Sequence, residues 1–205
     1  MSVRILLSYL IAGWSGFFVM GVELLGGRLL APTFGSSIYV WGAIITVFMF
    51  ALSMGYLAGG RYSMHAPSLA RLGVLLILAA LTVVPVILFS EPVLDAISIA
   101  APDPRFGSLL GSFCLFFVPT VFSGMISPYA VRLLVVDQAN SGRHAGQLYF
   151  VSTFGSAAGT LLTSFYLVLI LEVNQILLTL LAISLVLGGA ACALRIPMTV
   201  PIERT

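Results

Sequence analysis

Six long runs without a charged side chain dominate this sequence. Each contains at least 18 consecutive residues free of Asp, Glu, Lys and Arg. A membrane-spanning helix needs about 20 apolar residues to cross about 30 Å of hydrocarbon. The runs cover residues 5–22, 29–60, 72–90, 106–131, 145–171 and 173–194. We therefore predict an all-α protein, a single domain over residues 1–205 in which six transmembrane helices form a bundle.

The composition argues against a soluble fold. Hydrophobic residues make up 60% of the chain and charged residues only 8%, whereas about 25% of the residues of a soluble domain are charged. The formal net charge of +2 is too small to indicate a nucleic-acid partner. The lipid bilayer is thus the first predicted partner.

Turn-forming residues divide the runs into spans. Pro32 and the sequence Gly35-Ser36-Ser37 split the second run, and Pro85 is expected to end the third helix. The predicted spans are 5–30, 39–60, 69–89, 109–134, 147–171 and 175–194. Residues 91–105 form either a short helix on the membrane surface or an ordered external loop.

Prolines and glycines mark special positions inside the spans. Pro119 and Pro128 predict a kink in the fourth helix, because each proline removes a backbone hydrogen bond within the membrane. Gly155 and Gly159 in the fifth span form a small-xxx-small pattern that lets two helices approach closely. Gly55 and Gly59 give the second span a similar small face. These four glycines are predicted to pack helices together.

The distribution of arginine sets the topology, since all nine basic residues are arginine. If the N-terminus is cytoplasmic, the inner side receives seven of them: Arg4, Arg61, Arg71, Arg132, Arg143, Arg195 and Arg204. The outer side keeps Arg28 and Arg105, as the positive-inside rule requires. We expect the bacterial inner membrane with both termini cytoplasmic. The loop residues Arg61, Arg71, Arg132 and Arg143 are candidates to bind lipid headgroups or a cytoplasmic partner.

Several motifs resemble the transmembrane region of membrane-bound spermidine-synthase-like proteins. Residues 22–32 read VELLGGRLLAP and are followed by Gly35-Ser36-Ser37 and Trp41-Gly42, which is similar to the first-helix signature of that family. Further similar stretches are GYLAGGR at 55–61, SGM at 123–125 with Pro128, GQLY at 146–149 and GSAAGT at 155–160. The resemblance covers essentially all six spans.

The resemblance implies a bundle like half of a major-facilitator transporter, which in many members is fused to a cytoplasmic aminopropyltransferase-like domain. This chain stops after a short tail and has no glycine-rich loop to hold a nucleosyl cofactor. We therefore expect no cofactor and no enzymatic activity. No span contains a paired acid, a nucleophile with its base or a metal cluster, so neither catalytic residues nor a metal site are predicted.

Glu23 is the main candidate for ligand or partner binding, because a carboxylate within an apolar helix usually faces a partner or a cavity. Two placements remain open, one inside the bundle and one at the membrane interface. Arg28 and Tyr149 are further candidates. Arg28 lies about 140° round an ideal helix from Glu23, so the spacing does not imply a direct ion pair. A purely structural alternative is that Glu23 and Arg28 fix the first helix and its turn.

Two functions follow from these observations. The first is a membrane anchor or accessory subunit, assembled with other protein subunits in a hetero- or homo-oligomer. The alternative is a small carrier, working as a dimer because a major-facilitator carrier needs two six-helix halves. Polyamines or other cationic small molecules are the candidate ligands in that case.

Overall fold

The computed structural model describes residues 3–135 and 141–194, and within these ranges all regular secondary structure is helical. The elements are α1 (Val3–Phe34), α2 (Ile38–Ser63), α3 (Leu69–Leu81), α4 (Val84–Ala100), α5 (Pro104–Leu134), α6 (Ser141–Leu162), a π-helical turn (Thr163–Leu167), α7 (Val168–Ile170) and α8 (Val173–Ala193). Six segments are long and apolar enough to cross a membrane, α3 with α4 and α6 with α7 each counting as one. The predicted all-α bundle of six membrane helices is thus confirmed.

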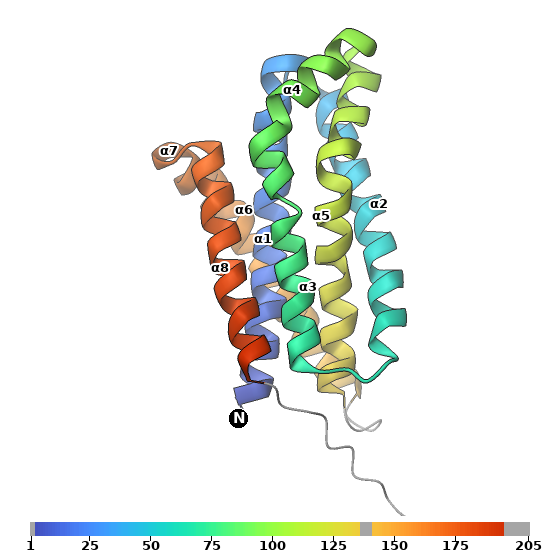
Figure 1. Cartoon of the computed structure of the whole chain (residues 1–205), viewed down its shortest axis with the longest axis vertical. Coiled ribbons are helices and arrows are strands. Elements are labelled where there is room, and N and C mark those ends of the chain that lie inside the picture. The colour runs from blue at the N-terminus through green and yellow to red at the C-terminus, as the bar shows by residue number, and fades with distance from the viewer. Residues whose placement is uncertain (1–2, 136–140, 195–205) are drawn as a thin grey trace, which may run out of the picture.

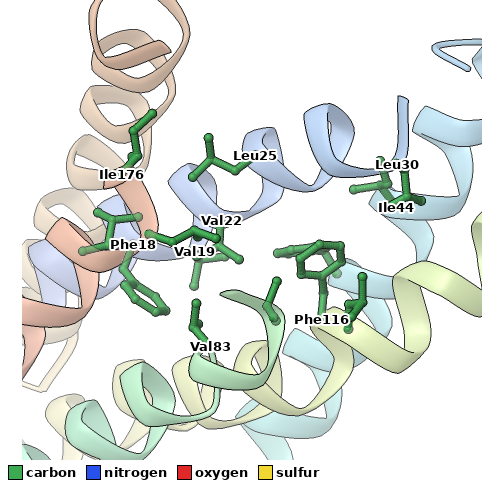
Figure 2. Close-up of a cluster of buried hydrophobic side chains, with 14 of the residues drawn as sticks. Phe18, Val19, Val22, Leu25, Leu30, Ile44, Val83, Phe116 and Ile176 are labelled. Atoms are coloured by element: carbon green, nitrogen blue, oxygen red, sulfur yellow. The ribbon is translucent and has the colours of Figure 1, made fainter. Parts of the chain in front are cut away.

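The spans run side by side and pack mainly in pairs (Figure 1). The closest pairs are α1 with α6, α2 with α5 and α3 with α8, and α1 also contacts α5. The larger core cluster surrounds the middle of α1, where Phe18, Val22 and Leu25 lie among side chains such as Val83 and Phe116 (Figure 2). The pairing therefore places α1 at the centre of the structure.

The turn between α1 and α2 forms at the predicted glycine, but α1 is longer than predicted. The helix continues through Pro32 to Phe34 instead of ending at residue 30. Gly35 has φ +79°, a left-handed conformation that suits glycine, and its N–H donates to the carbonyl oxygen of Ala31 at 2.9 Å. Gly35 therefore ends the helix. Pro32 does not end it, because a proline in the last turn leaves most helical hydrogen bonds intact.

The third span differs most from its prediction of 69–89. The helix breaks at Thr82 and Val83, before Pro85 and before the predicted end at residue 89, and Pro85 lies in the first turn of α4. A proline there begins a helix, because first-turn N–H groups have no helical partner to lose. The chain then stays helical to Ala100. Residues 91–100 are therefore helical as part of α4, so the loop alternative is wrong over most of the segment 91–105. The placement of this helix on the membrane surface stays a prediction.

The remaining spans also begin earlier than predicted, for reasons of helix capping. Asp103 caps α5, which begins at Pro104 rather than residue 109, and its Oδ1 accepts from the N–H of Arg105 at 2.9 Å. Glu172 and Gln175 form a reciprocal capping box at the start of α8. The fifth span begins at Ser141 rather than residue 147.

Helix α5 continues through Pro119 and Pro128. The hydroxyl of Ser123 donates to the carbonyl oxygen of Pro119 at 2.9 Å, and Ser15 of α1 donates to the carbonyl oxygen of Ser123 at 3.4 Å. Hydroxyl groups thus supplement the backbone hydrogen bonds of this proline-containing stretch. The kink itself stays a prediction.

The four glycines lie at helix contacts where a side chain would not fit. A Cβ atom on Gly155 would overlap the carbonyl oxygen of Gly13, and one on Gly159 would lie 2.5 Å from that of Phe17. On α2, a Cβ atom on Gly55 or Gly59 would overlap backbone carbonyl oxygens of α5. These glycines allow the backbones of the α1–α6 and α2–α5 pairs to touch.

We expect Gly155→Ala to lower the free energy of unfolding by about 1–3 kcal/mol, because the added methyl group pushes α6 away from α1. Gly146 on the same helix is the matched control, since nothing lies within 4 Å of a Cβ placed there. Gly146→Ala should be neutral or stabilising by up to about 1 kcal/mol. Thermal unfolding of both variants in detergent measures the difference, and equal midpoints would contradict the packing role.

Candidate functional site

Charges collect at the two ends of the bundle. Five described arginines lie at the end where α1 begins and α8 finishes (Figure 1), which we call the arginine end: Arg4, Arg61, Arg71, Arg132 and Arg143. Four acidic residues lie at the opposite, acidic end: Glu91, Asp95, Asp103 and Glu172. Arg195 and Arg204 fall outside the described residues.

Two of the arginines at the arginine end hold local structure. Arg71 donates from Nη1 to the carbonyl oxygens of His65 and Ala66, the latter at 3.1 Å, and so closes the turn between α2 and α3. Arg4 donates to the carbonyl oxygen of Leu133 at 3.2 Å. The side chains of the other three, Arg61, Arg132 and Arg143, are exposed. These three side chains are therefore accessible to lipid headgroups or to a partner protein.

Glu23 lies on a defined stripe of α1. Gly16, Met20, Glu23 and Gly27 are spaced by four, three and four residues, so they share one face of the helix. Gly16 packs against Ser156 of α6, and Gly27 packs against Trp41 near the start of α2. Both glycines are buried, whereas Met20 and Glu23 between them are only half-buried. The stripe is covered at both ends and open in the middle.

The Glu23 carboxylate forms no ion pair or hydrogen bond with another side chain among the described residues. Arg28 is exposed and lies in the part of α1 that approaches the turn to α2. The structure therefore does not join Glu23 and Arg28. Glu23 is half-buried within α1, and the choice between the bundle interior and the membrane interface stays a prediction.

Tyr149 of α6 and Tyr56 of α2 lie in the half of the bundle that is nearer the arginine end. Both side chains are about half exposed, at 57% and 49% respectively. Tyr149 lies between Gln147, which accepts a hydrogen bond from Tyr9, and Val151, which lies against Gly13. At 1.5 Å per residue this level of α1 is about 15–21 Å from Glu23, so the tyrosines do not adjoin the carboxylate. We name the half-buried middle of the stripe, Met20 and Glu23, the open face.

Hydroxyl groups of α6 border the open face but are engaged with their own helix. Ser156 donates to the carbonyl oxygen of Ser152 at 3.1 Å, and Thr160 donates to that of Ser156 at 3.0 Å. Such hydroxyls can still accept a hydrogen bond from a ligand or a neighbouring helix. Sequence reasoning selected Glu23, Arg28 and Tyr149 as binding candidates, and the structure does not bring Tyr149 together with Glu23.

The open face offers one half-buried carboxylate, bordered by hydroxyl groups of α6. Within residues 3–135 and 141–194, no three His, Cys, Asp or Glu side chains gather as metal ligands would. Its chemistry suits a positively charged or hydrogen-bonding group.

Comparisons of this chain with protein-family models, with curated proteins and with solved structures found no match. The resemblance to spermidine-synthase-like proteins therefore stays a prediction that rests on the motifs quoted above.

We expect Glu23→Gln to change the free energy of unfolding of the isolated protein by no more than about 0.5 kcal/mol, because no ionic contact is lost. Glu172→Ala provides the contrast, since loss of the α8 cap should cost about 1 kcal/mol. Thermal unfolding in detergent measures both. A clearly lower midpoint for Glu23→Gln would mean that the carboxylate holds the bundle together and would favour the structural alternative.

Proposed function

We propose that this protein is an integral membrane subunit that anchors or assists a larger complex and binds its partner through the open face. The proposed location is the bacterial inner membrane, with both termini in the cytoplasm. The arrangement of charges at the two ends supports this orientation, because the arginine end carries the positive residues that the cytoplasmic side retains.

The observation that carries the proposal is the unpaired, half-buried Glu23. A charged side chain within a membrane helix costs about 2.5–3.5 kcal/mol on insertion scales, and such residues usually pair with another group. The described part of the chain supplies no such pair. A partner helix with a basic or hydrogen-bonding side chain at the same depth would offset the cost.

The surroundings of Glu23 also favour a helical partner. The spans α2 and α6 cover the two ends of the α1 stripe and leave Met20 and Glu23 between them half-buried. A hydrogen bond from a partner helix to Glu23 would contribute to association in the membrane. The motif resemblance suggests an aminopropyltransferase-like protein as one class of partner. Arg61, Arg132 and Arg143 at the arginine end would face such a partner on the cytoplasmic side of the membrane.

A second candidate function is a carrier formed by two copies of the chain. Transporter folds of this type place their substrate site near the midplane, between two six-helix halves. If two open faces met, Glu23 would lie at the interface and could attract a polyamine or another cation. This function is favoured only if the protein is a homodimer.

Glu23→Gln should reduce the amount of co-purified partner by at least about tenfold, because it removes one member of a buried charge pair. The measurement is mass spectrometry of the intact complex after gentle extraction from native membranes. Asp95→Asn, at an exposed acid of α4, is the control and should leave the partner bound. Unchanged recovery with Glu23→Gln would remove Glu23 from the binding site, and a homodimer without other proteins would favour the carrier.

The proposed orientation is tested by cysteine labelling in intact cells with a membrane-impermeant maleimide, after Cys114 and Cys192 are replaced by serine. Ile99, 84% exposed at the acidic end, and His65, exposed at the arginine end, provide the two positions. Ile99→Cys should react in intact cells, and His65→Cys only after the membrane is opened. The reverse pattern would invert the topology.

A further inference from the structure

A cavity of about 340 Å³ opens at the acidic end between α4 and α8. It is lined by Leu29 of α1, by Ile87, Leu88, Ser90, Glu91 and Pro92 of α4, and by Glu172, Val173 and Asn174 at the start of α8. Its volume is within the range of small-molecule sites. None of these residues belongs to the open face, so the cavity is a separate feature of the molecule.

The break between α3 and α4 explains why the cavity exists. Helix α3 packs closely against α8, whereas α4 packs mainly against α5 and has few contacts with α8 (Figure 1). The third span therefore leaves its neighbour after Thr82 and Val83. The space between α4 and the start of α8 remains unfilled, and side chains of both helices form its walls.

The two walls present the same charge. Glu91 of α4 and Glu172, which caps the N-terminus of α8, both line the mouth of the cavity, and both side chains are exposed. The capping box accounts for part of the hydrogen-bonding capacity of Glu172 and leaves Glu91 uncommitted. A positive group in the cavity would lie between two carboxylates, which favours a cation over an anion or a neutral molecule.

Ser90 provides an independent indication of a ligand. It is only 4% exposed and lines the cavity, and its hydroxyl group makes no hydrogen bond with the described residues. Other buried serines of the bundle bond to their own helix, as Ser8 does to Arg4 and Ser184 to Leu180. The Ser90 oxygen is not fully enclosed by the protein, so it is available to accept a hydrogen bond from a group in the cavity.

From these observations we propose that the cavity binds a primary ammonium group attached to an apolar body. An ammonium group has three N–H donors, which matches the carboxylate of Glu91, the carboxylate of Glu172 and the hydroxyl oxygen of Ser90. The apolar walls formed by Leu29, Ile87 and Val173 fit the rest of the molecule. The same chemistry is offered by a soluble amine and by an ethanolamine lipid headgroup at the membrane surface.

The test is calorimetric titration of the purified protein with benzylammonium in nanodiscs of phosphatidylglycerol. Benzyl alcohol, its neutral counterpart, should not bind. Glu91→Gln should weaken benzylammonium binding by about tenfold, because it removes a charged hydrogen bond. Asp95→Asn is the matched control, an exposed acid one turn further along α4 that does not line the cavity, and it should change the affinity less than about twofold.

Added phosphatidylethanolamine distinguishes the two sources of the ammonium group. Weaker benzylammonium binding in its presence identifies the lipid headgroup as the occupant, and unchanged binding identifies a soluble amine. The proposal is overturned if benzylammonium does not bind, if benzyl alcohol binds equally well, or if Asp95→Asn weakens binding as much as Glu91→Gln. Unchanged unfolding midpoints of both variants ensure that a loss of binding is not a loss of fold.

Discussion

The close contact of α1 with α6 is the constraint on which the rest of the bundle depends. In lipid, apolar side chains gain little by moving from acyl chains to another helix, so association rests on van der Waals packing and hydrogen bonds. Small residues on both helices bring the two backbones together: Gly13 and Gly16 of α1 face Gly155 and Ser156 of α6. That contact fixes where α6 crosses α1, and so determines which part of the Glu23 stripe is covered.

The prediction from sequence succeeded wherever a strong local signal existed. Charge-free runs located all six spans, and Gly35 located the first turn because its φ of +79° is readily adopted only by glycine. The ends of helices were predicted less well. The sequence predicts that Pro85 ends a helix, whereas it lies in the first turn of α4. A proline is compatible with either position, and the residues around Pro85 do not distinguish a helix end from a helix start.

The candidate sites show a sharper limit of sequence reasoning. Glu23 was identifiable because an acid within an apolar run is conspicuous in one dimension. The separation of Tyr149 from Glu23 was not, because it depends on how α6 packs against α1. The cavity at the acidic end was hidden for the same reason: Glu91 and Glu172 are 81 positions apart in the chain, and the region around Glu91 was left open between a short surface helix and an external loop.

The geometry of α1 separates the two proposed sites. Successive residues of an α-helix are rotated by about 100°, so Leu29, which lines the cavity, lies about 120° round the helix from Glu23. A partner helix on the open face would therefore contact a different side of α1 from a ligand in the cavity. Binding at one site does not sterically exclude binding at the other. Any dependence between them would have to pass through a shift of α1 itself, the helix that packs against both α4 and α6.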